Sequence, residues 1–241
     1  MNTSETISIL FDFDGTLVDT MKVIEMVVKN GMERLGSKLD EKKMMELITS
    51  LELDDNKVLK NTPKGGKLIY FKLFHYLGKF LGLSRLKSFI FMLYCLVNVP
   101  KNYKYAKPFE GVSDMILGLQ SESISLGIVT SARKKDIEKL FKRHLSNFNV
   151  IVTREMVSKI KPSPEGILKA MEMLNSNPKK TVYIGDFPHD IMAAREAGIN
   201  SIAVLTGSVT DAILEKENPT KICSNAVEAV EWYLKSENIY D

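Results

Sequence analysis

Short apolar runs alternate with segments of helical periodicity throughout the second half of this 241-residue chain. The apolar runs are too short for ordinary helices and are bounded by turn residues, so they predict strands. We expect these strands at residues 125–130, 149–153, 181–185 and 201–205. The helices between and after them are expected at residues 134–144, 164–174, 188–197 and 225–234. Alternating strands and helices predict a parallel sheet with helices on both faces, the doubly wound α/β class.

The first half of the chain has a different pattern. Residues 7–13 form a short run that is apolar on both faces, which predicts a buried strand. No strand signal follows between residues 20 and 105, where the apolar residues recur at helical spacing. Helices are expected there at residues 21–35, 41–51, 68–83 and 86–97. We therefore predict an α/β core, residues 1–18 and 106–241, interrupted by an all-helical insertion, residues 19–105.

The composition is that of a globular chain, with 44% apolar and 26% charged residues. Cys95 and Cys223 lie among apolar neighbours and are expected to be buried thiols. The longest nearly apolar run, residues 89–99, is too short to span a bilayer. The N-terminus has no basic segment followed by a long apolar one, as a secretory signal would. We expect a cytoplasmic protein.

Basic residues are concentrated in the helical insertion. Residues 56–107 contain eleven Lys or Arg and no Asp or Glu, so this segment carries +11 and the rest of the chain carries 3 − 11 = −8. Such asymmetry concerns partners or substrates rather than the fold. Its apolar and aromatic positions indicate a helical core or a dimer surface, while contact of the basic side chains with an anionic substrate or with anionic lipid stays open.

Two acidic residues follow the first predicted strand. Asp12 and Asp14 lie where the strand ends, and Gly15 permits a sharp exit from it. In open parallel sheets, ligands bind beyond the carboxyl ends of the strands. Neighbouring carboxylates repel each other unless a cation is present, and hard oxygen ligands of this kind suit Mg²⁺.

A second acidic pair lies at the end of another predicted strand. Asp186 and Asp190 flank the start of the helix expected at residues 188–197, and their spacing of four allows both to face one site. Together with the first pair they would complete an acidic metal pocket.

Two further features suit an anionic ligand. Thr130 and Ser131 end a predicted strand just before a helix, where hydroxyls and backbone N–H groups can bind phosphate. Lys161, followed by Pro162, would supply a positive charge among the four acids. Lys159 is a rival for that role.

These motifs together resemble the haloacid dehalogenase (HAD)-like superfamily, among its phosphatases with a helical cap. The matching segments are DFDGTLVDT at 12–20, KPFEGV at 107–112, the T-S pair at 130–131, K-P at 161–162 and GDFPHD at 185–190. The four motifs at 12–20, 130–131, 161–162 and 185–190, in this order, form a specific signal, and the segment at 107–112 also resembles the family's return from cap to core. The resemblance implies a Rossmann-like core, a helical cap that closes over the substrate, and Mg²⁺ as cofactor.

The resemblance also implies a role for each acid of the first pair. Asp12 would be the nucleophile, forming an aspartyl-phosphate, and would bind Mg²⁺ through one oxygen. Asp14 would protonate the leaving group and then activate water, while its backbone carbonyl binds the metal.

The remaining residues would serve the phosphoryl group and the metal. Thr130 and the Ser131 N–H would bind the transferred group, and Lys161 would offset its charge. Asp186 would be a metal ligand, and Asp190 a ligand or the support of one. The sequence departs from the family pattern directly after Asp186, where the family often has a small hydroxyl residue and this chain has Phe187, followed by Pro188.

We therefore expect a magnesium-dependent phosphatase that acts on a small phosphorylated metabolite, with phosphoglycolate phosphatase as the nearest activity. One alternative is a phosphoryl-transferring mutase of the beta-phosphoglucomutase type; a dehalogenase fits less well because Asp14 serves oxygen leaving groups. Another is a non-catalytic regulatory or membrane-surface protein. No nucleic acid and no membrane contact are expected, and the protein is expected to be a monomer or a homodimer.

Overall fold

The computed structural model describes residues 6–38, 75–76, 78–120 and 124–237. The chain divides into two compact units, one formed by Met1–Asp19 with Lys107–Asp241 and the other by Thr20–Ala106. The first unit is α/β and the second is helical in its described part. Every residue that the sequence singled out for chemistry belongs to the α/β unit.

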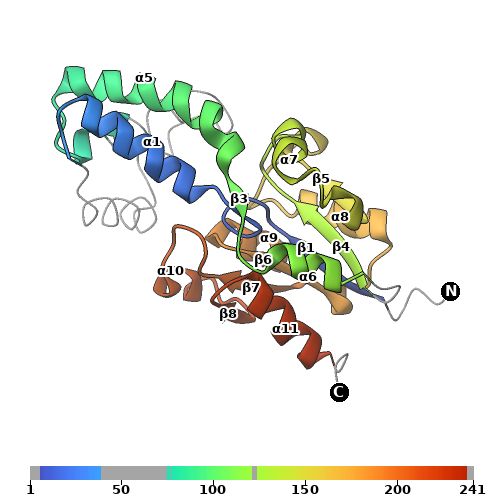
Figure 1. Ribbon diagram of the computed structural model, residues 1–241. Coiled ribbons are helices and arrows are strands. Elements are labelled where there is room, and N and C mark those ends of the chain that lie inside the picture. The colour runs from blue at the N-terminus through green and yellow to red at the C-terminus, as the bar shows by residue number, and fades with distance from the viewer. Residues whose placement is uncertain (1–5, 39–74, 77, 121–123, 238–241) are drawn as a thin grey trace. The chain divides into compact units, whose positions relative to one another are not determined.

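A six-stranded sheet lies at the centre of the α/β unit (Figure 1). All of its neighbouring strands are parallel. In spatial order they are β5 (Val150–Val152), β4 (Ile124–Val129), β1 (Ile7–Phe11), β6 (Thr181–Gly185), β7 (Asn200–Val204) and β8 (Lys221–Cys223). This confirms the parallel α/β fold that the alternating pattern predicted.

The strand β1 lies between β4 and β6, and all its residues are buried. A strand covered on both faces needs apolar side chains on both, which explains the uninterrupted apolar character of this segment. The strand was expected to reach residue 13, but it ends at Phe11. Asp12 still donates its N–H to the carbonyl oxygen of Ile184 at 2.8 Å, and the chain turns immediately afterwards.

Helices cover the sheet in two layers. They are α6 (Val112–Gly118), α7 (Lys134–Phe141), α8 (Glu165–Leu174), α9 (Pro188–Ala197), α10 (Asp211–Glu215) and α11 (Ala226–Ser236). The helices α8 and α9 contact each other and bury Leu10 and Tyr183 of the sheet in one apolar cluster. Because crossovers between parallel strands are right-handed, α6 and α7 cover the opposite face, and α11, the last helix, contacts α6.

Several elements are shorter than predicted or carry little sequence signal. The helix expected at residues 134–144 ends at Phe141, and a 3-10 turn, Leu145–Asn147, follows it. Further 3-10 turns lie at Arg154–Met156 and Pro178–Lys180. Two-residue strands β2 (Val18–Asp19) and β3 (Lys107–Pro108) pair antiparallel where the chain leaves and re-enters the α/β unit. Such short elements, like β8, α6 and α10, span too few residues to show a period.

The helical unit is built on two long helices, α1 (Met21–Arg34) and α5 (Arg85–Asn102), the latter followed by a 3-10 turn, Tyr103–Tyr105. They correspond to the helices expected at residues 21–35 and 86–97. Their facing sides bury an apolar cluster that includes Val28, Phe91 and Cys95. The helix expected at 41–51 lies outside the described residues, and of the one expected at 68–83 only residues 75–76 and 78–80 are described as helical. Cys95 and Cys223 are buried free thiols, as expected.

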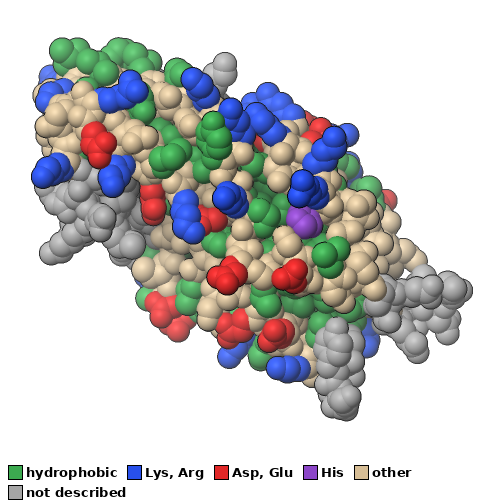
Figure 2. Space-filling view, viewed as in Figure 1, with side chains coloured by type: hydrophobic (Ala, Val, Ile, Leu, Met, Phe, Trp, Pro, Cys, Tyr) green, Lys and Arg blue, Asp and Glu red, His purple; other side chains and the backbone are tan. Residues whose placement is uncertain are grey.

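The outward side of α5 is apolar along most of its length. Leu86 and Val97 are 70% and 65% exposed, and Phe89, Ile90 and Leu93 are also exposed. Figure 2 shows apolar side chains along this edge of the molecule with basic side chains close by. This differs from an ordinary amphipathic helix, whose outer face is polar. Among the described residues, no helix combines the length and the apolar character that a membrane span requires.

Candidate functional site

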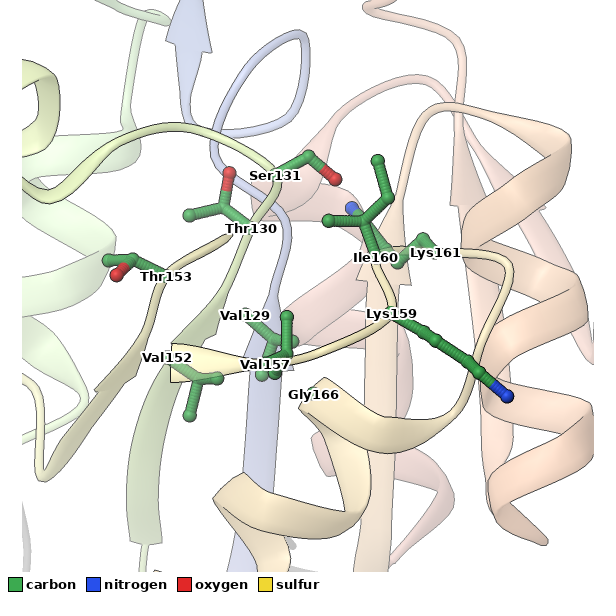
Figure 3. Close-up of a pocket in the computed structure, with 10 residues that line it drawn as sticks. All are labelled: Val129, Thr130, Ser131, Val152, Thr153, Val157, Lys159, Ile160, Lys161 and Gly166. Carbon is green, nitrogen blue, oxygen red and sulfur yellow. The ribbon is translucent and has the colours of Figure 1, made fainter. Parts of the chain in front are cut away.

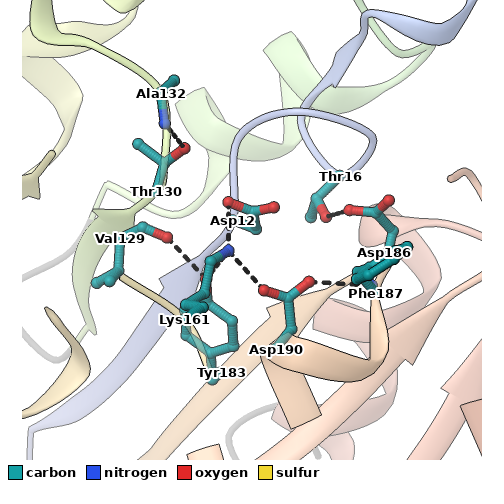
Figure 4. Close-up of polar contacts among 10 residues, drawn as sticks. All are labelled: Asp12, Thr16, Val129, Thr130, Ala132, Lys161, Tyr183, Asp186, Phe187 and Asp190. Atoms are coloured by element: carbon teal, nitrogen blue, oxygen red, sulfur yellow. Dashed lines mark hydrogen bonds and ion pairs between the residues drawn. The ribbon is translucent and has the colours of Figure 1, made fainter. Parts of the chain in front are cut away.

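The strand order brings the predicted site residues to one edge of the sheet. Asp12 follows β1, Thr130 follows β4 and Asp186 follows β6, and these three strands are direct neighbours. Lys161 comes from the connection between β5 and α8, and Asp190 from the first turn of α9. Figure 4 shows these side chains converging beyond the carboxyl end of β1. The strand β1, predicted from its apolar run, thus leads directly to Asp12, the central carboxylate of the site.

Lys161 is the cation at the centre of this group. Its Nζ lies 2.7 Å from Asp12 Oδ1 and 2.5 Å from Asp190 Oδ1, and its side chain is only 10% exposed. The contact with Asp12 is an ion pair without the geometry of a hydrogen bond. Lys159, the rival suggested by the sequence, is exposed, and its side chain points away from Thr130 and Ser131 (Figure 3). Of these two lysines, Lys161 is the one that lies beside the buried carboxylates.

The site holds more negative than positive charge. Asp12, Asp186 and Asp190 are buried, and one carboxylate oxygen from each lies within 4.8 Å of the others. Lys161 forms ion pairs with Asp12 and Asp190, so these three acids and the lysine, when fully ionised, carry −3 + 1 = −2. Carboxylates that lie this close together with so little solvent must either bind a proton or pair with another cation.

The pKa values follow from this arrangement. Burial raises the pKa of Asp12 to about 6; Lys161 lowers it and Asp190 raises it, but burial prevails. Burial, with the charges of Asp190 and Asp12, also raises the pKa of Asp186 well above its ordinary value. Burial alone would lower the pKa of Lys161, but the two carboxylates beside it raise that pKa well above its ordinary value. Lys161 therefore stays protonated, whereas ionising Asp12 and Asp186 in this buried site costs free energy.

These residues fit a divalent cation. Carboxylate oxygens are the ligands that Mg²⁺ prefers, and a charge of +2 would balance the excess on the three acids. Asp190 already has a partner at each oxygen, since Oδ2 accepts the Phe187 N–H at 3.0 Å and Oδ1 contacts Lys161. Phe187 and Pro188, which depart from the family pattern, therefore leave the connection between this loop and Asp190 intact.

Asp186 is closely enclosed by its surroundings. Its Oδ1 accepts a hydrogen bond from the buried Thr16 hydroxyl at 2.9 Å. Two glycines abut the same carboxylate, because a Cβ added to Gly15 or Gly207 would overlap it. Gly15 also has a φ of +79°, which favours glycine. The Asp186 carboxylate is thus held in one position by contacts on several sides.

A methyl group at residue 207 should displace that carboxylate. We expect Gly207→Ala to weaken Mg²⁺ binding about 10- to 100-fold, as loss of ligand support commonly does. Isothermal titration calorimetry with MgCl₂ measures the affinity. The matched control is Gly118→Ala in α6, where nothing lies within 4 Å of the added Cβ. Equal affinities for both variants and the wild type would contradict a role of Asp186 as a ligand.

The loop after Asp12 is tied to a second loop of the core. The Gly15 N–H donates to the Val18 carbonyl oxygen at 2.9 Å, closing a tight turn. The Thr206 hydroxyl donates to the Gly15 carbonyl oxygen at 2.6 Å. Asp14 lies in this turn and is partly exposed, and its carboxylate does not belong to the cluster of oxygens that could hold a metal. Its position suits proton transfer to a ligand better than metal binding through the side chain.

Thr130 and Ser131 lie on the other side of Asp12. The buried Thr130 hydroxyl accepts the Ala132 N–H at 3.0 Å, and a hydroxyl that accepts one hydrogen bond can still donate its own proton. Ser131 is partly exposed. Beneath these residues lies a small cavity of about 10 Å³, also lined by Lys161 (Figure 3). It holds no more than about one water molecule, so a substrate cannot enter it as it stands.

Four residues of this site carried no role in the sequence argument. Tyr183 contacts Lys161, Thr16 contacts Asp186, Gly207 abuts Asp186, and Thr206 holds the loop of Asp12. Of these four, only Tyr183 could have been noticed in the sequence. It lies in a predicted buried strand, and a buried phenol needs a hydrogen-bond partner. In the sequence, Thr206 and Gly207 look like ordinary turn residues after a strand, so no signal marked them as part of the site.

Comparison with known proteins agrees with this geometry. The model of the haloacid dehalogenase-like hydrolase family matches residues 9–204. A protein of Caldanaerobacter subterraneus, provisionally named pyrophosphatase PpaX, is 30% identical over 220 residues, which cover 88% of this chain and 87% of that protein. Pyrophosphatase PpaX of Bacillus mycoides is 26% identical over 88% of this chain and 89% of its own length.

A solved structure shares the fold. The structure described as a predicted phosphoglycolate phosphatase from Haemophilus somnus superposes with a TM-score of 0.67, covering 96% of this chain and 99% of its own. Its sequence identity is 17%, so the similarity concerns the fold alone.

Proposed function

The chain belongs to the haloacid dehalogenase-like hydrolase family, and from this premise we propose that it is a magnesium-dependent phosphohydrolase in which Asp12 attacks the phosphoryl group. One observation carries the proposal: Asp12 is buried at the end of the central strand, paired with Lys161 and within reach of two further carboxylates. Phosphoryl transfer depends mainly on positioning and on neutralising charge, and this arrangement provides both.

The first step would place the phosphoryl group on Asp12. A carboxylate oxygen of Asp12 forms a bond to phosphorus while the bond from phosphorus to the leaving oxygen breaks. Asp14, as the carboxylic acid, gives its proton to the leaving oxygen. Because the pKa of Asp12 is about 6, most of this carboxyl group is ionised and nucleophilic at neutral pH.

The second step would return Asp12 to its starting state. Asp14, now a carboxylate, takes a proton from a water molecule that attacks phosphorus, and the bond between phosphorus and the Asp12 oxygen breaks. Inorganic phosphate leaves and Asp14 is again protonated. Throughout, the Thr130 hydroxyl and the Ser131 N–H would donate to phosphoryl oxygens, and Lys161 would offset their charge.

Asp12, Asp186 and the backbone carbonyl of Asp14 would hold Mg²⁺, which supplies positive charge opposite the phosphoryl oxygens. Asp190 is a further ligand or the support of the others. Its contacts with Lys161 and with the Phe187 N–H favour the supporting role. The inserted helical unit, residues 20–106, is proposed to act as the cap that selects the substrate.

Two substrate classes have separate support. A small phosphate monoester fits a site that handles an oxygen leaving group through Asp14. Inorganic pyrophosphate is favoured by the relatives named pyrophosphatase PpaX, which match over 88% of this chain. A mutase of the beta-phosphoglucomutase type uses the same first step but returns the phosphoryl group to a sugar.

Phosphate release from a panel of compounds tests the proposal. The panel contains pyrophosphate, phosphoglycolate and sugar phosphates, each with Mg²⁺ and with a chelator. We expect release from one or a few compounds, lost with chelator and restored by added Mg²⁺, because the three acids need a cation to accept an anionic substrate. Isomerisation of a sugar phosphate without free phosphate would indicate the mutase. Absence of both reactions would contradict the proposed function.

A further inference from the structure

The hydroxyl of Tyr183 lies between two parts of the site. Tyr183 belongs to β6 and is fully buried. Its hydroxyl donates to the carbonyl oxygen of Val129 at 2.7 Å and accepts an N–H from Lys161 Nζ at 3.0 Å (Figure 4). These directions are forced, because a carbonyl oxygen only accepts and an ammonium only donates. Only a side chain that both donates and accepts can occupy this position without leaving a buried group unpaired.

The contact completes the surroundings of the lysine. An ammonium has three N–H groups, and Lys161 Nζ has three close partners: Asp12, Asp190 and Tyr183. The two carboxylates attract the cation, and the Tyr183 hydroxyl accepts a hydrogen bond from it. Since a lysine stem is long and flexible, three partners at different angles hold the amine where two would allow it to swing.

The same hydroxyl also reaches the phosphate-binding side of the site. Val129 is the last residue of β4 and directly precedes Thr130. Tyr183 therefore joins three segments that are distant in sequence: its own strand β6, which leads to Asp186, the loop that carries Lys161, and the end of β4. Among the described residues, no other hydrogen bond or ion pair connects Lys161 to β4 through a shared side chain.

We propose that Tyr183 is a positioning residue, which holds the Lys161 ammonium against Asp12 and fixes the end of β4 that carries Thr130. When a phosphoryl group reaches Asp12, Lys161 must direct an N–H toward a phosphoryl oxygen while it stays beside Asp12. Tyr183 and Asp190 then keep the amine in place. This inference rests on the proposed function for its catalytic part, whereas the positioning of Lys161 is independent of it.

The catalytic part is tested with Tyr183→Phe, which removes the hydroxyl and keeps the ring. We expect kcat for phosphate release to fall about 10- to 100-fold, as when the partner of a catalytic group is lost, with KM nearly unchanged. The matched control is Tyr233→Phe in α11, because Tyr233 is also buried and its hydroxyl has no hydrogen-bond partner in the described structure. The control is expected to keep wild-type kcat and KM.

The positioning part has a readout that needs no substrate. In ¹⁵N NMR spectra a buried, hydrogen-bonded lysine ammonium gives a slowly exchanging signal, which Lys161→Gln identifies by its loss. We expect this signal to exchange at least about tenfold faster with solvent in Tyr183→Phe and to be unchanged in Tyr233→Phe.

The two measurements separate the possible failures. An unchanged ammonium signal in Tyr183→Phe would overturn the proposal. A changed signal with wild-type kcat would overturn the catalytic role. If the wild type itself releases no phosphate from any compound of the panel, the proposed function fails, and a changed signal still supports the positioning of Lys161 by Tyr183.

Discussion

Replacing Asp12 by Asn is expected to lower kcat for phosphate release by about ten-thousand-fold or more, the usual scale for loss of a nucleophile. The amide has nearly the shape of the carboxylate but neither its charge nor its nucleophilic oxygen. Activity is measured with a compound that the panel identifies, at saturating Mg²⁺ and substrate. A variant with wild-type kcat would contradict the assignment of Asp12.

The same substitution should stabilise the fold, which separates lost chemistry from lost structure. Burial raises the pKa of Asp12 from 3.8 to about 6, so between these values the folded chain binds more protons than the unfolded chain. Ionised Asp12 therefore costs stability as pH rises through this window. Without divalent cation, Asp12→Asn should unfold at higher urea than the wild type at pH 7, and the difference should shrink toward pH 4. Lower stability at pH 7 would contradict the charge argument.

Replacing Lys161 by Met is expected to have the second largest effect. It leaves Asp12, Asp186 and Asp190 buried without their cation, and breaking a buried ion pair in this way costs about 3–5 kcal/mol. We expect a loss of that size in the free energy of unfolding, measured with urea in the presence of chelator. Because Lys161 also offsets charge on the phosphoryl group, kcat should fall about 100- to 1,000-fold.

The control for this variant is Lys159→Met. Lys159 lies two residues away and is exposed, so its loss should change neither stability nor kcat noticeably. Added Mg²⁺ should restore part of the stability lost in Lys161→Met, because the cation neutralises the same carboxylates. If the two variants behave alike, Lys161 is not the cation of the site.

The site residues at the ends of strands could be predicted from the sequence. Asp12, Thr130 and Asp186 each follow an apolar run, and parallel strands bring such ends to one edge of the sheet. In the sequence, only the family motif distinguished Lys161 from Lys159. In the structure the two differ in burial, since the Lys161 side chain is enclosed beside Asp12 and Lys159 is exposed.

Other parts of the site depend on the packing of distant segments. Gly207 matters because its loop lies against Asp186, and Tyr183 because β6 carries its hydroxyl to Lys161 and Val129. Neither contact leaves a periodic pattern or a characteristic spacing in the sequence. The short strands β2, β3 and β8 were likewise missed, because two or three residues held by neighbouring backbone leave no pattern of their own.

Finding the phosphoryl group on Asp12 tests the central claim most directly. Enzyme in turnover with a compound from the panel is quenched in acid, digested, and its peptides are searched by mass spectrometry for one added phosphoryl group. We predict that the group lies on the peptide containing Asp12, at Asp12 itself, and that Asp12→Asn carries none. A phosphoryl group on another residue, or equal labelling of Asp12→Asn, would contradict this account.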